Sequence, residues 1–271
     1  MRVLYIAPYV PYETIPHAGG YFFYTYLKGL AKEIQITLLA PDTDDNREAV
    51  KKLDVDVKVI LTGKERKNSL LEKVFIEIPR NVVQPLYLAR WQEEAYIKQV
   101  ETPGFLDSFD LVELQWSQML SLVPAIKKVN PHIPITAFEH DVFTQSVYRR
   151  AMEASSLSKN KVENMLRAIR VKQEETKALN QCEAVFCFSD KDKSLLQDMG
   201  VTSQVYPLTP SFDIPEEPSP LDQGLNCLFV GALNRLENSE SVLWFIKEVW
   251  HKIIGEIPNA KLVVVGAHPP Q

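Results

Sequence analysis

The 271-residue sequence has only three cysteines, no long apolar run and neither of the common glycine-rich nucleotide motifs. Cys182, Cys187 and Cys227 form no CxxC pair and lie in or beside apolar strand-like runs. This favours buried thiols in a reducing cytoplasm and gives no metal site. No apolar run approaches the ~18 residues of a membrane span, and the N-terminus lacks the apolar core of a signal peptide. The net charge of -5 disfavours a nucleic-acid partner, because nucleic-acid binders usually carry a basic surface.

The first 32 residues contain a strand pattern, a pair of glycines and a helix pattern. Residues 3–6 are an unbroken apolar run, typical of a strand buried on both faces of a parallel sheet. Residues 21–32 have an amphipathic helical pattern. Between them, Gly19 and Gly20 predict a loop in which φ > 0 lets an anion approach the N–H groups of the helix N-terminus. The alternative is that the glycines only make room for the turn. The missing GxGxxG and GxxxxGK[ST] motifs disfavour a nicotinamide site and a Walker loop.

Strand and helix patterns alternate along the rest of the chain. Strand-like runs cover residues 34–40, 55–61, 110–115, 133–138, 183–188 and 204–206. The alternation predicts an α/β fold with a Rossmann-like parallel sheet, in which ligands bind outside the carboxyl ends of the strands. Gln115 and Trp116 end one strand, and His140 and Asp141 follow the next, so we expect them at one crevice. A structural polar cluster is the alternative for this histidine. Strand alternation places Glu139 on the face opposite His140, which argues against a glycosidase carboxylate pair.

A change in composition divides the chain. Five prolines between residues 207 and 220 mark a linker. We therefore predict an N-terminal Rossmann-like domain at 1–206, a proline-rich linker at 207–224 and an incomplete second Rossmann-like domain at 225–271. So short a unit rarely buries enough apolar surface by itself, so we expect it to pack on the first domain or on a second copy in a homodimer.

The segment 63–80 is rich in basic side chains. They are Lys64, Arg66, Lys67, Lys73 and Arg80. One interpretation is a solvated surface. The other is a peripheral contact with an anionic acceptor or with the lipid headgroups of a membrane.

Several segments together resemble GT-B glycosyltransferases of the group 1, family 4 type. The run FVGALNRLENSESVLWFIKEVWHKIIGEIPNAKLVVVG resembles the opening βαβ unit of that family's second domain. HAGGYFFYTYLKGLAK resembles its glycine-rich loop and first helix, CEAVFCFSDKDKSLL its strand and helix before the linker, and AFEHD its histidine-bearing loop. The resemblance implies a retaining hexosyltransferase with an acceptor-side first domain and the start of a donor-binding second domain.

The resemblance also implies roles for individual residues. His140 matches the histidine beside the donor sugar and the acceptor, and is the catalytic candidate. Gly19 and Gly20 match the loop near the donor diphosphate, and Gly231 matches the glycine that ends the first strand of the donor domain. Arg235 is the available phosphate-binding cation, displaced from the family position. Gln115, Trp116 and Asp141 are the acceptor-side candidates.

The expected partners are a nucleotide-sugar donor and a carbohydrate or lipid-linked acceptor, with no cofactor and no metal. The resemblance places most of the nucleotide pocket beyond residue 271, so we expect this chain alone to be inactive. A GT-B sugar-nucleotide epimerase is the nearest alternative. Another is a non-catalytic Rossmann-like module that binds a partner or polyanion through the basic segment.

Overall fold

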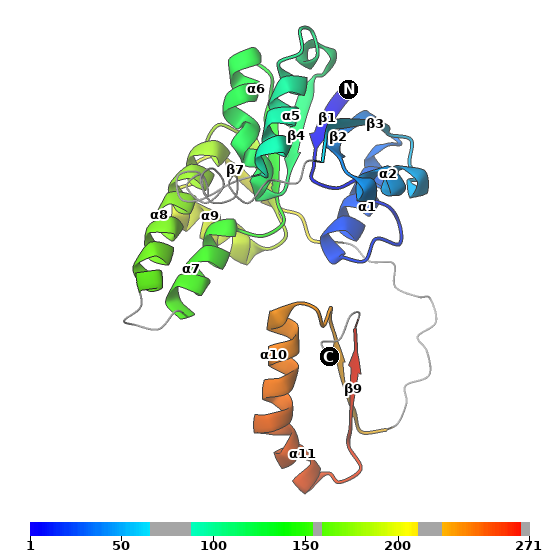
Figure 1. Cartoon of the computed structure of the whole chain (residues 1–271), viewed down its shortest axis with the longest axis vertical. Helices are drawn as coiled ribbons and strands as arrows, with labels where there is room; N and C mark the ends of the chain where they lie inside the picture. Colours follow the sequence, from blue (N-terminus) through cyan, green and yellow to red (C-terminus); the bar gives the residue numbers. More distant parts are fainter. Residues whose placement is uncertain (66–87, 154–158, 211–223, 267–271) are drawn as a thin grey trace. The chain divides into compact units, whose positions relative to one another are not determined.

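The computed structural model describes residues 1–65, 88–153, 159–210 and 224–266. The chain divides into two compact units, Met1–Ser211 and Phe212–Gln271. The division falls inside the predicted linker, most of which lies outside the described residues. The first unit is built on a seven-stranded parallel sheet, so the predicted fold class is confirmed (Figure 1).

The sheet has the strand order β3-β2-β1-β4-β5-β6-β7. Its strands are β1 (Arg2–Ile6), β2 (Gln35–Asp42), β3 (Lys58–Lys64), β4 (Leu111–Gln115), β5 (Ile135–Glu139), β6 (Ala184–Cys187) and β7 (Gln204–Pro207). The chain builds outward from β1 to β3 and then returns to β4, which pairs with the free side of β1. The strand order therefore reverses between β1 and β4, and ligands of doubly wound sheets bind at such a point.

Helices cover both faces of this sheet, as Figure 1 shows. They are α1 (Ala18–Leu30), α2 (Asp44–Lys52), α5 (Arg90–Val100), α6 (Val123–Val129), α7 (Phe143–Glu153), α8 (Lys159–Leu179) and α9 (Asp190–Met199), with the 3-10 turns η2 (Leu106–Ser108) and η3 (Ser117–Leu122). The ends of α9 carry residues that favour them: the Ser189 hydroxyl accepts from Asp192 N, and Gly200 ends the helix at φ 103°. The serine pair at residues 155–156, which favours a break between two helices, lies outside the described residues.

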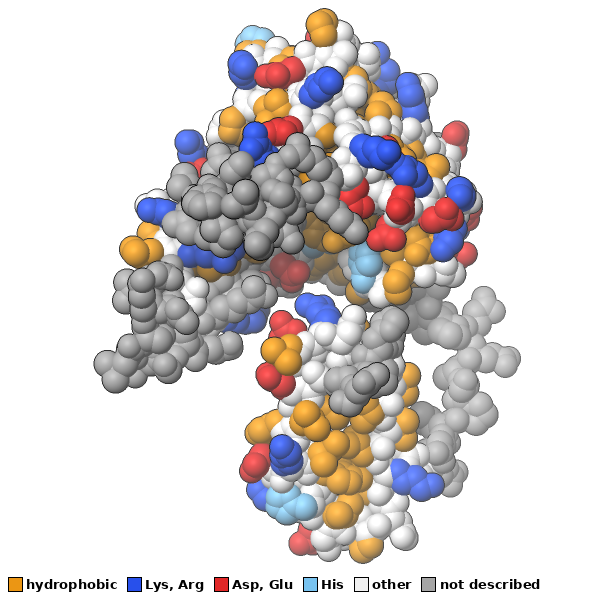
Figure 2. Space-filling view, viewed as in Figure 1, with side chains coloured by type: hydrophobic (Ala, Val, Ile, Leu, Met, Phe, Trp, Pro, Cys, Tyr) orange, Lys and Arg blue, Asp and Glu red, His pale blue; other side chains and the backbone are white. Residues whose placement is uncertain are grey.

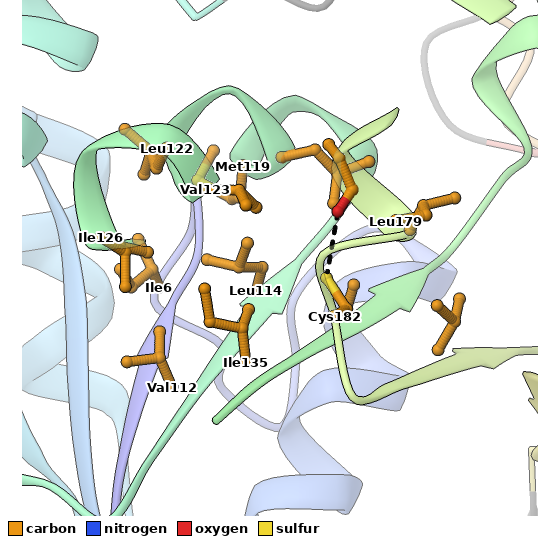
Figure 3. Close-up of a cluster of buried hydrophobic side chains, with 14 of the residues drawn as sticks. Ile6, Val112, Leu114, Met119, Leu122, Val123, Ile126, Ile135, Leu179 and Cys182 are labelled. Atoms are coloured by element: carbon orange, nitrogen blue, oxygen red, sulfur yellow. Dashed lines mark hydrogen bonds between the residues drawn. The ribbon is translucent and has the colours of Figure 1, made fainter. Parts of the chain in front are cut away.

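Strand alternation distributes the apolar side chains over two cores. In β1, Val3 and Tyr5 pack with α1 and α2, whereas Leu4 and Ile6 pack on the opposite face. Figure 3 shows part of this second core, in which Leu114 and Ile135 of the sheet meet side chains of η3 and α6. Because β1 is buried on both faces, its sequence is an unbroken apolar run rather than an alternating one.

Two details concern the predicted thiols and the basic segment. Cys182 and Cys187 are buried and Cys227 is half-buried, all three unpaired. β3 covers Lys58–Lys64, so the predicted strand at 55–61 was placed three residues too early, and its pairing with β2 continues past a bulge at Pro41/Asp42. The other basic residues of the segment, Arg66, Lys67, Lys73 and Arg80, lie outside the described residues.

The second unit has a parallel pair of strands and a helix. Its elements are β8 (Asn226–Val230), α10 (Leu236–Phe245), the π turn η4 (Ile246–Trp250), α11 (His251–Glu256) and β9 (Lys261–Val265). Figure 2 shows apolar side chains gathered on its surface; Leu228 is 65% exposed, Val230 70% and Trp244 59%. A parallel sheet normally has both faces covered, so this unit exposes an unusual amount of apolar strand surface. Across the described part of the chain, no helix is both long and apolar enough to span a membrane.

Candidate functional site

The N-terminus of α1 differs from the prediction. The helix begins at Ala18, so Gly19 and Gly20 form its first turn instead of a preceding loop, and neither has positive φ. The His17 side chain caps the helix, with its Nδ1 accepting from Gly20 N at 2.9 Å. The expected loop was therefore wrong, and Gly20 does not offer a free N–H group, because an N-cap side chain already binds it.

Close packing explains the glycines better than backbone freedom does. A Cβ atom on Gly19 would lie 3.3 Å from Nδ1 of His140 and 3.5 Å from Cζ2 of Trp116. A Cβ atom on Gly20 would lie 2.5 Å from Cε1 of the capping His17. The absent side chain of Gly19 thus lets the first turn of α1 lie directly against His140. The structure thus brings Gly19 of α1 against Trp116, which follows β4, and His140, which follows β5. These residues meet where the strand order reverses.

His140 lies in an aromatic enclosure. The Trp116 ring stacks on the imidazole with centroids 3.9 Å apart and an angle of 8° between the planes. Phe22, Phe138 and Phe188 surround it at centroid distances of 5.8, 5.2 and 5.2 Å. Only 8% of His140 is exposed. This burial, with a smaller effect from the positive charge His17 can carry, lowers the pKa of His140 to about 3. The imidazole is therefore neutral near pH 7, with one donor and one acceptor nitrogen.

A chain of hydrogen bonds runs from His140 into the sheet. Its Nε2 lies 2.9 Å from Oε1 of Gln115, whose Nε2 donates to Oε1 of Glu113 at 2.6 Å. Oε2 of Glu113 accepts from the hydroxyls of Tyr26 at 3.3 Å and Thr136 at 3.2 Å. Burial raises the pKa of Glu113 to about 7, although all these donors favour the charged form. Sequence reasoning missed Glu113, although a charge inside an apolar strand, two residues before Gln115 and so on the same face, is a detectable signal.

Trp116 forms one wall of the site. Its backbone has φ 73°, the one positive value of a non-glycine residue in the described ranges, where β4 turns into η3. Its ring also makes edge contacts with Tyr9 and Phe23. Such a conformation is unfavourable for a bulky residue and persists only where the surroundings hold it. The stacked Trp116 ring therefore fixes the plane of the His140 ring.

The carboxylates of Glu139 and Glu175 lie on the face of the sheet opposite His140. Glu139 is buried and accepts from the Ser117 hydroxyl, which also lies 3.0 Å from the Asp141 carbonyl oxygen. Glu175 of α8 accepts from Phe143 N and Thr144 N, each at 2.9 Å. Burial, with the nearby negative charge of Glu175, raises the pKa of Glu139 well above its usual range. Burial also raises the pKa of Glu175, against the hydrogen bonds that this carboxylate accepts. The side chain of Asp141 is exposed. These contacts anchor α7 and α8, and they lie on the side of the sheet away from His140.

The donor-side candidates lie in the second unit. Gly231 follows β8, and its N–H donates to the Val265 carbonyl oxygen at 3.0 Å. Arg235 is exposed at the N-cap position of α10, and Asn238 Nδ2 donates to the Ala232 carbonyl oxygen. A role of Gly231 and Arg235 in phosphate binding stays a prediction. In the described ranges, no group of three or more His, Cys, Asp or Glu side chains is arranged to hold a metal ion.

Comparison with solved structures identifies the fold. Sucrose-phosphate synthase from Thermosynechococcus elongatus superposes on 100% of this chain with a TM-score of 0.61 and 14% identity. The chain shares the GT-B fold. It spans 63% of that synthase, and its sequence matches no family model and no characterised protein. A GT-B trehalose-phosphate synthase (UDP-forming) from Burkholderia vietnamiensis matches with a TM-score of 0.54, 12% identity and coverage of 100% of this chain and 65% of that one.

A putative epimerase matches this chain about as well as the two synthases do. A putative UDP-N-acetylglucosamine 2-epimerase from Listeria monocytogenes has a TM-score of 0.51 and 12% identity, with 99% of this chain and 63% of that one covered. At these identities the likeness concerns the fold. The group 1, family 4 assignment stays a prediction.

Proposed function

We propose that this chain is part of a nucleotide-sugar-dependent glycosyltransferase, in which the first unit supplies the acceptor side. The observation that carries the proposal is the meeting of a neutral, enclosed His140 with the first turn of α1 where the GT-B sheet reverses its strand order. A neutral imidazole suits hydrogen bonding to a sugar hydroxyl, because it offers one acceptor nitrogen without a charge. We propose that the transfer is retaining and needs no metal.

The donor diphosphate is proposed to lie at the N-terminus of α1. The amides of Ala18 and Gly19 are in the first turn, where the helix dipole favours an anion. The neutral imidazole of His140 adds no positive charge, so anion binding at this helix end depends on backbone N–H groups. In the second unit, Gly231 and Arg235 are proposed separately as phosphate-binding residues.

A carbohydrate acceptor is supported by a hollow of about 330 Å³ beside His17. Two tyrosine rings, Tyr9 and Tyr12, line it together with the carboxylates of Asp45 and Glu48. Tyr9 also contacts the rings of His17 and Trp116, with centroids 5.2 and 5.5 Å apart, so one wall of the hollow packs against a residue of the site. Aromatic faces and carboxylates suit the apolar faces and hydroxyls of a sugar.

The test compares this chain with one extended at its C-terminus along its reading frame. UDP-glucose is the probe, because the matched trehalose-phosphate synthase is described as UDP-forming. We expect weak or no binding by calorimetry and no donor hydrolysis for the 271-residue chain, and both to appear in the extended chain. Equal turnover in the two chains would show that the donor site is placed wrongly.

A sugar-nucleotide epimerase is the second candidate, favoured by the match to the putative 2-epimerase. The two functions differ in product. An epimerase converts UDP-N-acetylglucosamine into its C2 epimer without an acceptor, whereas a transferase releases UDP and needs an acceptor for efficient turnover. Product analysis by NMR of the extended chain with each donor separates them, and an epimerised sugar nucleotide would replace the first proposal.

A further inference from the structure

The carboxylate of Glu113 fixes the orientation of the amide beside it. It is 3% exposed and lies at the centre of β4, where its Oε1 accepts from Gln115 at 2.6 Å. The hydroxyls of Tyr26 and Thr136 occupy its other oxygen. An ionised carboxylate only accepts hydrogen bonds. The NH₂ group of Gln115 must therefore face Glu113, because the reverse orientation would oppose two acceptor oxygens in a buried site.

The amide orientation in turn fixes the proton on His140. With its NH₂ group directed at Glu113, Gln115 presents Oε1 to Nε2 of His140 at 2.9 Å. An oxygen acceptor requires a proton on Nε2, and a neutral imidazole carries only one proton. Nδ1 is then an acceptor. It is buried without a hydrogen-bond partner and faces Gly19, whose Cβ position lies 3.3 Å away.

We propose that Glu113 is a positioning residue, which acts through Gln115 to hold His140 in its Nε2–H tautomer, with Nδ1 as the acceptor nitrogen that faces the first turn of α1. The tautomer follows from the hydrogen bonds alone; only its use toward a sugar hydroxyl rests on the proposed glycosyltransferase function. The wrong tautomer would present an N–H group where an acceptor is needed, and the site would lose its complementarity to a hydroxyl that donates.

The neighbouring titratable groups do not disturb this arrangement at alkaline pH. Tyr5 of β1 and Tyr26 of α1 face Glu113, and burial beside this carboxylate raises the pKa of both hydroxyls far above their usual range. His17 faces His140, and burial lowers the pKa of His17 below its usual value. At pH 8.5, above the pKa of about 7 for Glu113, the carboxylate is ionised and both histidines are neutral.

The experiment is NMR of the 271-residue chain labelled with ¹⁵N in its histidine rings, recorded at pH 8.5 without substrate. The His140 signals are assigned from their absence in H140Q. In the wild type we expect an Nε2 shift typical of a protonated nitrogen and an Nδ1 shift typical of an unprotonated one. In Glu113→Gln, the new amide can donate or accept, so both orientations of Gln115 become available and the two shifts should move toward each other.

Thr136→Val is the matched control, because it removes a hydrogen bond to Glu113 without touching Gln115; it should keep the wild-type shifts. If Glu113→Gln does not fold, Gln115→Met decides, since it breaks the link and should also bring the two shifts together. A proton on Nδ1 in the wild type, or wild-type shifts in the deciding variant, would overturn the proposal. Because no sugar nucleotide is present, this outcome is independent of whether the chain takes part in glycosyl transfer.

Discussion

Glu113 places a carboxyl group inside the sheet, and its burial makes folding stability depend on pH. Its pKa is raised from 4.5 to about 7 in the folded protein. A raised pKa means that the folded state holds the proton more tightly, so the stabilisation is complete below pH ~4.5 and is lost as the pH rises through 7. A shift of this size corresponds to roughly 3 kcal/mol.

We therefore expect Glu113→Gln to flatten the pH dependence of stability. Urea unfolding between pH 4.5 and 8 should show the wild type losing stability relative to this variant as the pH rises. Glu33→Gln, at an exposed position in the turn after α1, is the control and should follow the wild type. A wild type that gains stability over this range relative to Glu113→Gln would mean that the hydrogen bonds outweigh burial.

Gly19 and Gly29 of α1 differ in the space around them, so substitution of each by alanine tests how closely α1 approaches His140. Alanine at Gly29 would meet nothing within 4 Å, whereas at Gly19 it would meet His140 and Trp116. Glycine is less favourable than alanine inside a helix by ~1 kcal/mol, so Gly29→Ala should stabilise the protein by about that amount. We expect Gly19→Ala to show no such gain in thermal unfolding and to shift the ring resonances of His140. A similar gain at both positions would contradict the close approach of α1 to His140.

At the level of secondary-structure elements, α7 depends on a side chain from α8. Glu175 is fully buried and accepts from two backbone N–H groups at the start of α7 and from the Thr144 hydroxyl. Its loss leaves these donors unsatisfied in a buried place. We expect Glu175→Ala to reduce the free energy of unfolding by about 2–4 kcal/mol in urea titrations.

The neighbouring Glu174 is exposed and supplies the control. Glu174→Ala should change the free energy of unfolding by less than ~0.5 kcal/mol, as is usual for surface sites. An equal loss in both variants would indicate that the α8 helix itself, rather than the capping of α7, responds to the substitutions.

The elements were predictable because their signals are local. The strands of the first unit follow from strand-like runs, although β3 was placed three residues too early, and the ends of α9 follow from Ser189 and Gly200. The start of α1 was misplaced because glycines are common in turns, whereas here His17 caps the helix and Gly19 meets a ring from another strand. That contact joins residues 121 positions apart in the sequence, and no local pattern encodes it.

Part of the site was predictable from the order of the strands. His140, Gln115 and Trp116 were expected together because parallel strands end at one edge of the sheet. The pairing of Gln115 with Glu113, and the aromatic enclosure from Phe22 and Phe188, depend on side-chain directions across separate elements. These became visible only in three dimensions.

For the whole molecule, the proposed function predicts that sugar transfer takes place at the edge of the sheet beside His140. The first unit presents two histidines at opposite ends of β5: His140 follows the strand, and the exposed His132 precedes it. The doubly wound sheet makes these positions unequal, since ligands bind at the carboxyl ends of the strands. His132→Ala is thus a control with the same chemistry at the wrong end of the same element.

The direct measurement is the rate of sugar transfer from UDP-glucose by the C-terminally extended chain, compared among the wild type, His140→Ala and His132→Ala. The acceptor is one found by screening with the wild type. Loss of a positioned proton-handling side chain typically costs 10²–10⁴-fold in rate, so we expect His140→Ala to lose at least ~10²-fold in kcat while His132→Ala keeps the wild-type value. Unchanged turnover in a folded His140→Ala variant would contradict the assignment of the site.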